Sequence, residues 1–82
     1  MPTLRRLSGL DVLDILAQFG FEVIRIKGSH YVLRRTLDTG RQTLTVPVHG
    51  KQPLATGTLR AIYRAASQYV PEEDLKPHFY SD

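Results

Sequence analysis

Two short turns limit how this 82-residue chain can fold. Gly28-Ser29 separates the segment "FEVIRIK" from "HYVLRRTL", and "DTG" at 38–40 separates the second segment from "QTLTVPV". All three segments are rich in β-branched and aromatic residues, and short turns that contain glycine join antiparallel strands as hairpins. We therefore expect three consecutive antiparallel strands between about residues 21 and 48.

The third segment alternates between apolar and polar side chains, which is typical of a strand with one buried face. Its apolar residues are Leu44, Val46 and Val48, and the residues that point the other way are Thr43, Thr45 and Pro47. Proline has no N–H to donate to a neighbouring strand. Pro47 therefore predicts a position at a sheet edge or near the end of its strand.

The second segment has a more apolar set of alternate residues, which we expect to point to the core. This set is Tyr31, Leu33 and Leu37. The opposite parity puts His30, Arg34 and Thr36 on the other face of the sheet, beside Thr43 and Thr45.

Two features do not follow this simple alternation. Val32 is apolar but has the parity of His30 and Arg34, and Arg35 is charged but has the parity of the core residues Leu33 and Leu37. The first segment is ambiguous, because the apolar residues Phe21 and Val23 have the same parity as the cation Arg25. The alternation therefore does not decide which face of the first strand is buried.

A helix is expected to begin near Gly9, because Ser8 and Asp11 have the spacing of a capping box with aspartate in the usual glutamate position. Gly20 ends this helix, since glycine readily takes the positive φ that follows a last helical turn. Its apolar side is formed by Leu10, Leu13, Ile15, Leu16 and Phe19, with Val12 near the margin.

A second helix is expected from about Gly57 to Tyr69, with Thr56 as its N-cap. The residues at helical spacing that should be buried are Leu59, Ile62, Tyr63, Ala66 and Tyr69. Pro71 and the acidic residues after it indicate one further helical turn, which a loose tail follows.

The expected order is α-β-β-β-α, an α+β fold in which a three-stranded antiparallel sheet carries two helices on one face. We expect a single domain over residues 1–82, with a core of about 8–70 and a tail of 71–82. The absence of cysteine excludes a disulfide framework, a thiolate zinc site and a cysteine nucleophile. Asp11 and Asp14 interrupt the first apolar stretch, so we expect no signal peptide, no membrane span and a cytoplasmic protein.

Positive charge is concentrated in the middle of the chain. Residues 25–64 have a net charge of +7, whereas residues 1–24 have −1 and residues 65–82 have −3. This distribution fits a surface that binds a polyanion. It fits a solvated surface of mixed sign equally well.

The stretches "GFEVIRIKGSHYVLRR" and "VPVHGKQPLATGTLRAIYRAA" together resemble the HicA family of mRNA interferase toxins, whose partners are HicB-type antitoxins. The resemblance runs over roughly residues 8 to 70. It implies a double-stranded-RNA-binding-like fold of the same α-β-β-β-α order and RNA cleavage without a metal or other cofactor. It also implies that His30, which follows Gly-Ser, is the catalytic histidine. Tyr31 stands where many members have a second histidine.

Metal-free RNA cleavage requires a base for the 2′-hydroxyl proton, cations for the charge that develops on the phosphorane, and a proton for the leaving 5′-oxygen. Histidine suits the first and last tasks, because it titrates near neutral pH. His30 is the candidate for them, although a histidine in a turn also serves as a backbone-bonding residue. The candidates for RNA contacts are Lys27, Ser29, Arg34, Thr43, Thr45 and Lys51.

His49 is either a second proton carrier or a residue that organises its loop, and His78 is expected to be solvated in an acidic tail. No histidines have the spacing of a metal site, so we expect no metal. Arg60 and Arg64 either extend the basic surface or are simply exposed. Besides an RNA-cleaving toxin, two further functions stay open: a non-catalytic RNA-binding module of the same fold and a protein-interaction adaptor.

Overall fold

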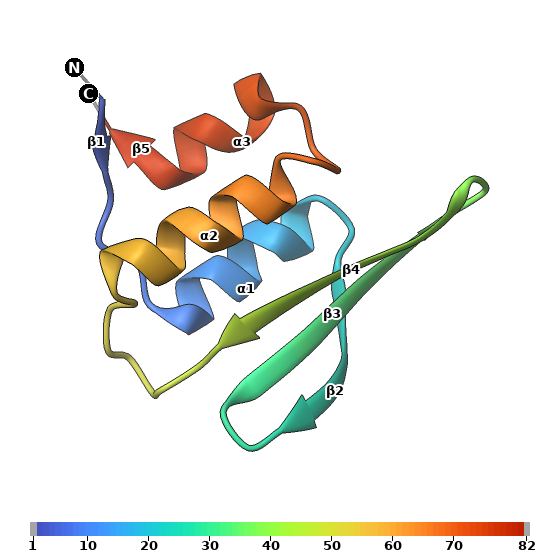
Figure 1. Ribbon diagram of the computed structural model, residues 1–82, viewed down its shortest axis with the longest axis horizontal. Helices are drawn as coiled ribbons and strands as arrows, with labels where there is room; N and C mark the ends of the chain where they lie inside the picture. The colour runs from blue at the N-terminus through green and yellow to red at the C-terminus, as the bar shows by residue number, and fades with distance from the viewer. Residues whose placement is uncertain (1, 82) are drawn as a thin grey trace.

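A computed structural model describes residues 2–81 of the chain, and residues 1 and 82, the two ends of the expected domain, lie outside the described residues. The elements are β1 (Thr3–Leu4), α1 (Gly9–Gln18), β2 (Glu22–Lys27), β3 (His30–Leu37), β4 (Gly40–Pro47), α2 (Thr56–Ala66), α3 (Glu72–Phe79) and β5 (Tyr80–Ser81). Strands β2, β3 and β4 form an antiparallel sheet in that order, and β1 pairs with β5. The α+β class and the central α-β-β-β-α order are thus confirmed (Figure 1).

Helix α1 begins as its capping box predicts. The backbone N–H of Asp11 donates to the Ser8 hydroxyl oxygen (3.1 Å), and the N–H of Ser8 donates to the Asp11 carboxylate (2.9 Å). The prediction of its buried side was wrong at two positions. Val12 is fully buried and Leu10 is 39% exposed, because α1 faces the core through the stripe that contains Val12, Ile15 and Leu16.

A β-bulge in β2 resolves the ambiguity of the first strand. Val23 is opposite Leu33 while Arg25 is opposite Val32, which leaves Ile24 as the extra residue. One extra residue reverses the alternation along the strand. Val23 therefore shares the face of the buried Leu33, whereas Arg25 lies on the opposite face.

Helices α1 and α2 lie on one face of the three-stranded sheet (Figure 1). The sheet contributes Leu33, Leu44 and Val46 to the core, and α2 contributes Leu59 and Ile62 among others. The predicted inward residues Leu44 and Val46 of β4 and Leu59, Ile62, Tyr63 and Ala66 of α2 are thereby confirmed, whereas Val48 follows β4 and is only partly buried. The hairpin of β3 and β4 extends beyond the helices, which leaves Leu37 41% exposed on the face where it was expected to be buried.

The second helix starts at Thr56 and ends at Ala66, so the expected N-cap was wrong: Ala55 occupies that position and has no side chain that can cap. Tyr69, expected in this helix, lies after it and is partly buried against the core.

The expectation of a loose tail after residue 71 was also wrong. Residues Glu72–Phe79 form α3, with Leu75 and Phe79 fully buried, and β5 then pairs with β1. Three acidic residues in the first turn of α3 favour this helix, because they face the positive end of its dipole. Within residues 2–81, no helix is both long enough and apolar enough to cross a bilayer.

Candidate functional site

The turn between β2 and β3 fixes the backbone on which His30 stands. Gly28 has φ of +60°, as the first central residue of a type II′ hairpin turn requires, and Ser29 completes the turn. The carbonyl of Ser29 accepts the N–H of Val48 (2.7 Å), which ties the turn to the end of β4. His30 is the first residue of β3 and is exposed.

No helix within residues 2–81 lies over one face of the β2–β3–β4 sheet, and we call it the open face (Figure 1). The cross-strand register assigns to it Glu22, Arg25, Lys27, His30, Val32, Arg34, Thr36, Arg41, Thr43, Thr45 and Pro47. The predicted placement of His30, Arg34, Thr36, Thr43 and Thr45 on one face is confirmed. Four cations and one carboxylate share this face, so it is strongly basic.

The register also shows which candidates are neighbours. Lys27 and Pro47 are directly opposite His30, on β2 and β4. Residues directly opposite each other have Cβ atoms about 5 Å apart, so Lys27 is the cation beside the imidazole. Thr45 lies one row away, opposite Val32. A positive side chain, a hydroxyl and a titratable ring therefore surround one spot on the open face.

Arg34 is farther from His30 than the sequence suggests. It lies four residues along β3, which corresponds to about 13 Å, and it is opposite Glu22 and Thr43. Its Nε is buried and has no hydrogen-bond partner among residues 2–81. Arg34 therefore does not belong to the group of side chains around His30.

The loop after β4 carries the remaining candidates, His49 and Lys51, and both are exposed. The carbonyl of His49 accepts the N–H of Gln52 (3.2 Å), so the loop is held through the backbone at this position. Ser29 is half-buried in the turn next to His30. The structure brings Lys27, Ser29, His30 and Thr45 together, and it separates Arg34 and Thr43 from them by position along the strands.

Arg25 is a cation near His30 that sequence reasoning did not assign to the candidate site. It lies on the open face opposite Val32, one row from His30, because of the bulge at Ile24. Arg35, by contrast, does not lie on the open face. Its guanidinium donates to the carbonyls of Phe19 (2.9 Å) and Tyr69 (2.8 Å) and lies over the Phe21 ring, 4.9 Å from its centre.

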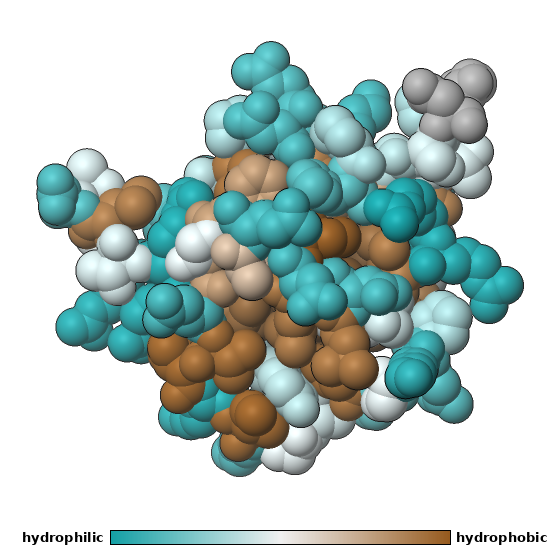
Figure 2. Space-filling view, turned by 180° about the vertical axis from the view of Figure 1, so that it is seen from behind, coloured by the Kyte–Doolittle hydropathy of each residue, from teal (hydrophilic) through white to brown (hydrophobic). Residues whose placement is uncertain are grey.

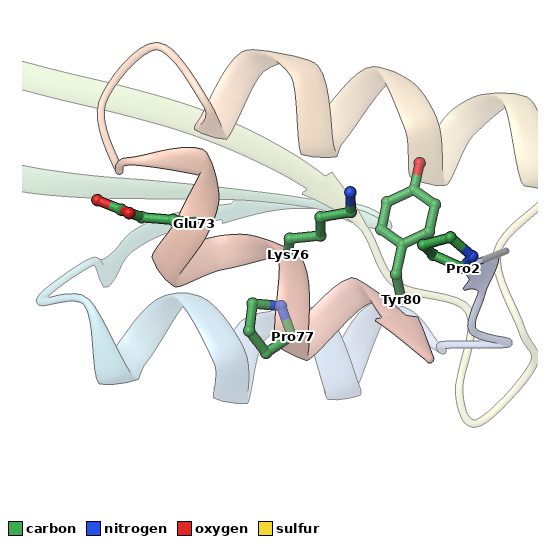
Figure 3. Close-up of a pocket in the computed structure, with 5 residues that line it drawn as sticks. All are labelled: Pro2, Glu73, Lys76, Pro77 and Tyr80. Atoms are coloured by element: carbon green, nitrogen blue, oxygen red, sulfur yellow. The ribbon is translucent and has the colours of Figure 1, made fainter. Parts of the chain in front are cut away.

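A pocket of about 400 Å³ lies elsewhere on the molecule, lined by Pro2, Glu73, Lys76, Pro77 and Tyr80. Figure 3 shows these side chains on α3, on β5 and just before β1, with Lys76 and Tyr80 extending to the same side. It contains no histidine and no hydroxyl–imidazole pair. It is therefore separate from the candidate acid–base residue His30.

His78 is not solvated as expected. It is half-buried in α3, and its ring meets Phe19 edge-on with 5.4 Å between centroids. Among residues 2–81, no three histidine, aspartate or glutamate side chains lie close enough together to hold a metal ion.

Two comparisons with known proteins bear on this site. A family model described as the HicA toxin of bacterial toxin-antitoxin systems matches residues 9–67. This stretch includes α1, the entire three-stranded sheet and α2, and hence the whole open face. No curated protein matches the chain significantly.

Proposed function

The chain belongs to the HicA toxin family of bacterial toxin-antitoxin systems, and we propose that it is an endoribonuclease of the cytoplasm that cleaves mRNA without a metal. The observation that carries the proposal is the position of His30. It is exposed, its backbone is fixed by a tight turn, and Lys27 is directly opposite it on a basic face that no helix covers. Core packing does not explain a histidine there, and a lysine or arginine would serve a charge patch better.

The proposed reaction is an attack by the RNA on its own backbone. Neutral His30 takes the proton of a ribose 2′-hydroxyl, and the resulting 2′-oxygen attacks the adjacent phosphorus. Lys27 stabilises the additional negative charge of the phosphorane, with Arg25 one row away. The bond to the 5′-oxygen then breaks, and that oxygen takes a proton from His49, from water or from the imidazolium of His30. The products are a 2′,3′-cyclic phosphate and a 5′-hydroxyl.

RNA binding in this proposal follows the rows of the open face. Lys27, Ser29 and Thr45 contact the phosphate beside His30, and Arg34 and Thr43 contact the chain farther along β3 and β4. Lys51 extends the contacts from the loop after β4. Arg34 suits this role, because it lies on the open face and its guanidinium can approach a phosphate with two donors.

A toxin of this kind has a cognate antitoxin, and we propose that it is of the HicB type and covers His30 and the neighbouring cations. The basic open face favours a partner surface with acidic residues among apolar ones. A complex in which His30 stays accessible to solvent would contradict direct occlusion and leave an indirect mechanism only.

One observation favours a second candidate, a non-catalytic RNA-binding module. The residue after His30 is Tyr31, and its side chain lies on the opposite face, packed against the core. The row of His30 itself consists of Lys27, His30 and Pro47 and holds a single imidazole. In this alternative His30 contacts the sugar or the phosphate and transfers no proton.

Incubation of the wild-type protein with RNA in EDTA distinguishes the candidates. The toxin cleaves it and leaves 2′,3′-cyclic phosphate ends, whereas RNA with a 2′-deoxy residue at the cleavage position stays intact. Binding without cleavage would favour the RNA-binding module. An absence of both would favour the protein adaptor and overturn the proposal.

A further inference from the structure

The outer edge of β4 has backbone groups that point away from the sheet. Because the N–H of Val48 bonds to Ser29, the alternation of an antiparallel ladder directs the even-numbered residues of β4 toward β3. The odd-numbered residues Arg41, Thr43 and Thr45 then direct their N–H and C=O groups outward. Pro47 offers only a carbonyl there, and this carbonyl oxygen lies against Gly9 at the start of α1.

Between this edge and α2 lies an open groove of about 320 Å³. Thr43 and Thr45 form the strand side, and Thr58, Ala61 and Ala65 are exposed on the helix side. These helix residues are small, so a further strand beside β4 would meet a smooth apolar wall on the helix side of the sheet. On the other side it would continue the open face.

The two edges of the sheet differ in how well they can accept a strand. Strand β2 has a bulge and carries charged residues at three of its six positions, and both features protect an edge against further pairing. Its residues Val23, Ile24 and Ile26 are exposed and apolar. Figure 2 shows hydrophobic residues together on the lower part of the face that it presents. Strand β4 is regular over all eight residues of its pairing with β3.

We propose that the antitoxin adds a β-strand to the free edge of β4, between this edge and α2. The inference rests on the antitoxin part of the proposed function and is independent of RNA cleavage. Its occupant is indicated by charge: the open face has Arg25, Lys27, Arg34 and Arg41 against Glu22 alone. The added strand has acidic residues toward the open face, near Arg41 and Arg34, and small apolar residues toward Ala61 and Ala65.

This mode of binding would connect the edge with the candidate active site. Pro47, at the end of the edge, is in the same cross-strand row as His30 and Lys27. A chain that leaves the edge at Pro47 therefore emerges two strands from His30, with only β4 between them. Backbone bonds along β4 would supply affinity, and the emerging segment would cover the histidine.

Amide hydrogen exchange of the toxin, alone and in complex with its purified cognate antitoxin, tests this proposal. The His30→Ala protein serves for both samples, so the result does not depend on nuclease activity. In the complex, the N–H groups of Arg41, Thr43 and Thr45 should exchange at least about tenfold more slowly, as new hydrogen bonds require. Ile26, whose N–H points outward from the other edge, should keep its rate.

A proline at the edge provides the matching variant. Thr43→Pro removes one outward N–H and no bond to β3, and it should weaken antitoxin binding by about tenfold or more. Two controls should bind within about twofold of the parent: Thr43→Val, which keeps the N–H, and Ile26→Pro on the β2 edge. Circular dichroism verifies that each variant is folded. If Thr43→Pro does not fold, the amide-exchange experiment, which does not use this variant, decides the question.

Three results would overturn the proposal. The first is unchanged exchange at Arg41, Thr43 and Thr45 in the complex. The second is a loss of affinity in Ile26→Pro equal to that in Thr43→Pro. The third is slow exchange of the same three amides in the toxin alone that depends on its concentration, which would assign the edge to a second copy of the chain.

Discussion

Each cation on the open face has a place in the cross-strand ladder, and in the proposed complex with RNA that place determines which phosphate it would reach. Lys27 is beside His30, whereas Arg34 is about 13 Å along the sheet. Both lie on one face with no helix above them. A single-stranded RNA that follows this face therefore releases a counterion at each of them.

RNA binding should accordingly weaken with salt, with a slope of roughly −0.7 per phosphate neutralised. Lys27→Ala and Arg34→Ala should each flatten the slope by about one contact. Arg64 is an exposed cation on α2 that faces the opposite side of the molecule. Arg64→Ala should therefore leave the slope unchanged. Filter binding at a series of salt concentrations measures this, and a slope of zero would contradict an RNA surface.

Single residues show why a charge count was only partly informative. The sequence places Arg35 in the basic middle segment, but its guanidinium caps the ends of two helical segments through the carbonyls of Phe19 and Tyr69. Those carbonyls are distant in sequence and become neighbours only in the folded protein. Arg25 was not assigned for a related reason, because the bulge that turns it to the open face has no signature in "EVIRIK".

At the scale of elements, one hydrogen bond ties α3 to α2. The Tyr63 hydroxyl donates to the Glu72 carboxylate (2.8 Å). Burial, and then the bond and charge of Glu72, raise the pKa of Tyr63 to about 12. The folded protein therefore holds this proton more tightly than the unfolded chain, whose tyrosine has a pKa near 10.

This difference predicts how stability depends on pH. The contribution of Tyr63 is complete below pH 10 and is lost as the pH rises through about 12. Tyr63→Phe should cost about 1 kcal/mol at neutral pH, because it breaks the bond to Glu72. Urea unfolding from pH 8 to 12 should show a smaller decline for Tyr63→Phe than for the wild type. Parallel curves would contradict the bond.

The elements that were predicted correctly have local signals. A capping box starts α1, a positive-φ glycine follows it, and two short turns define the three strands. The start of α2 was misplaced by one residue because Ala55, which carries no capping group, precedes it. Helix α3 was expected as a single turn, since its stability derives from the burial of Leu75 and Phe79 against distant residues.

At the scale of the whole molecule, the first and last strands, β1 and β5, lie side by side at one side of the core. Strand β1 pairs with β5, and Arg5 donates to the carbonyls of Phe79 (2.8 Å) and His78 (2.8 Å). The Phe79 ring packs edge-on against Tyr63, with 5.3 Å between centroids. In so small a protein, these contacts form a large share of the core.

Phe79→Ala should therefore destabilise the protein by about 3–5 kcal/mol, as expected for the loss of a fully buried aromatic ring. Glu73→Ala, at an exposed position of the same helix, should stay within about 0.5 kcal/mol of the wild type. Urea denaturation of both variants provides the values. Equal stability of Phe79→Ala and wild type would mean that α3 does not belong to the cooperative core.

The exposure of His30 beside Lys27 depends on a turn, on the bulge in β2 and on a helix layer that covers only the other face of the sheet. The proposed catalytic role of His30 is tested most directly by the rate at which the His30→Ala protein cleaves RNA. RNA affinity and folding are measured on the same protein. A general acid–base group contributes about 10²–10⁴-fold in rate, so His30→Ala should cleave at the limit of detection. Its RNA affinity and unfolding curve should change little, and His49→Ala should lose less activity. Cleavage by His30→Ala at the wild-type rate would contradict the catalytic assignment.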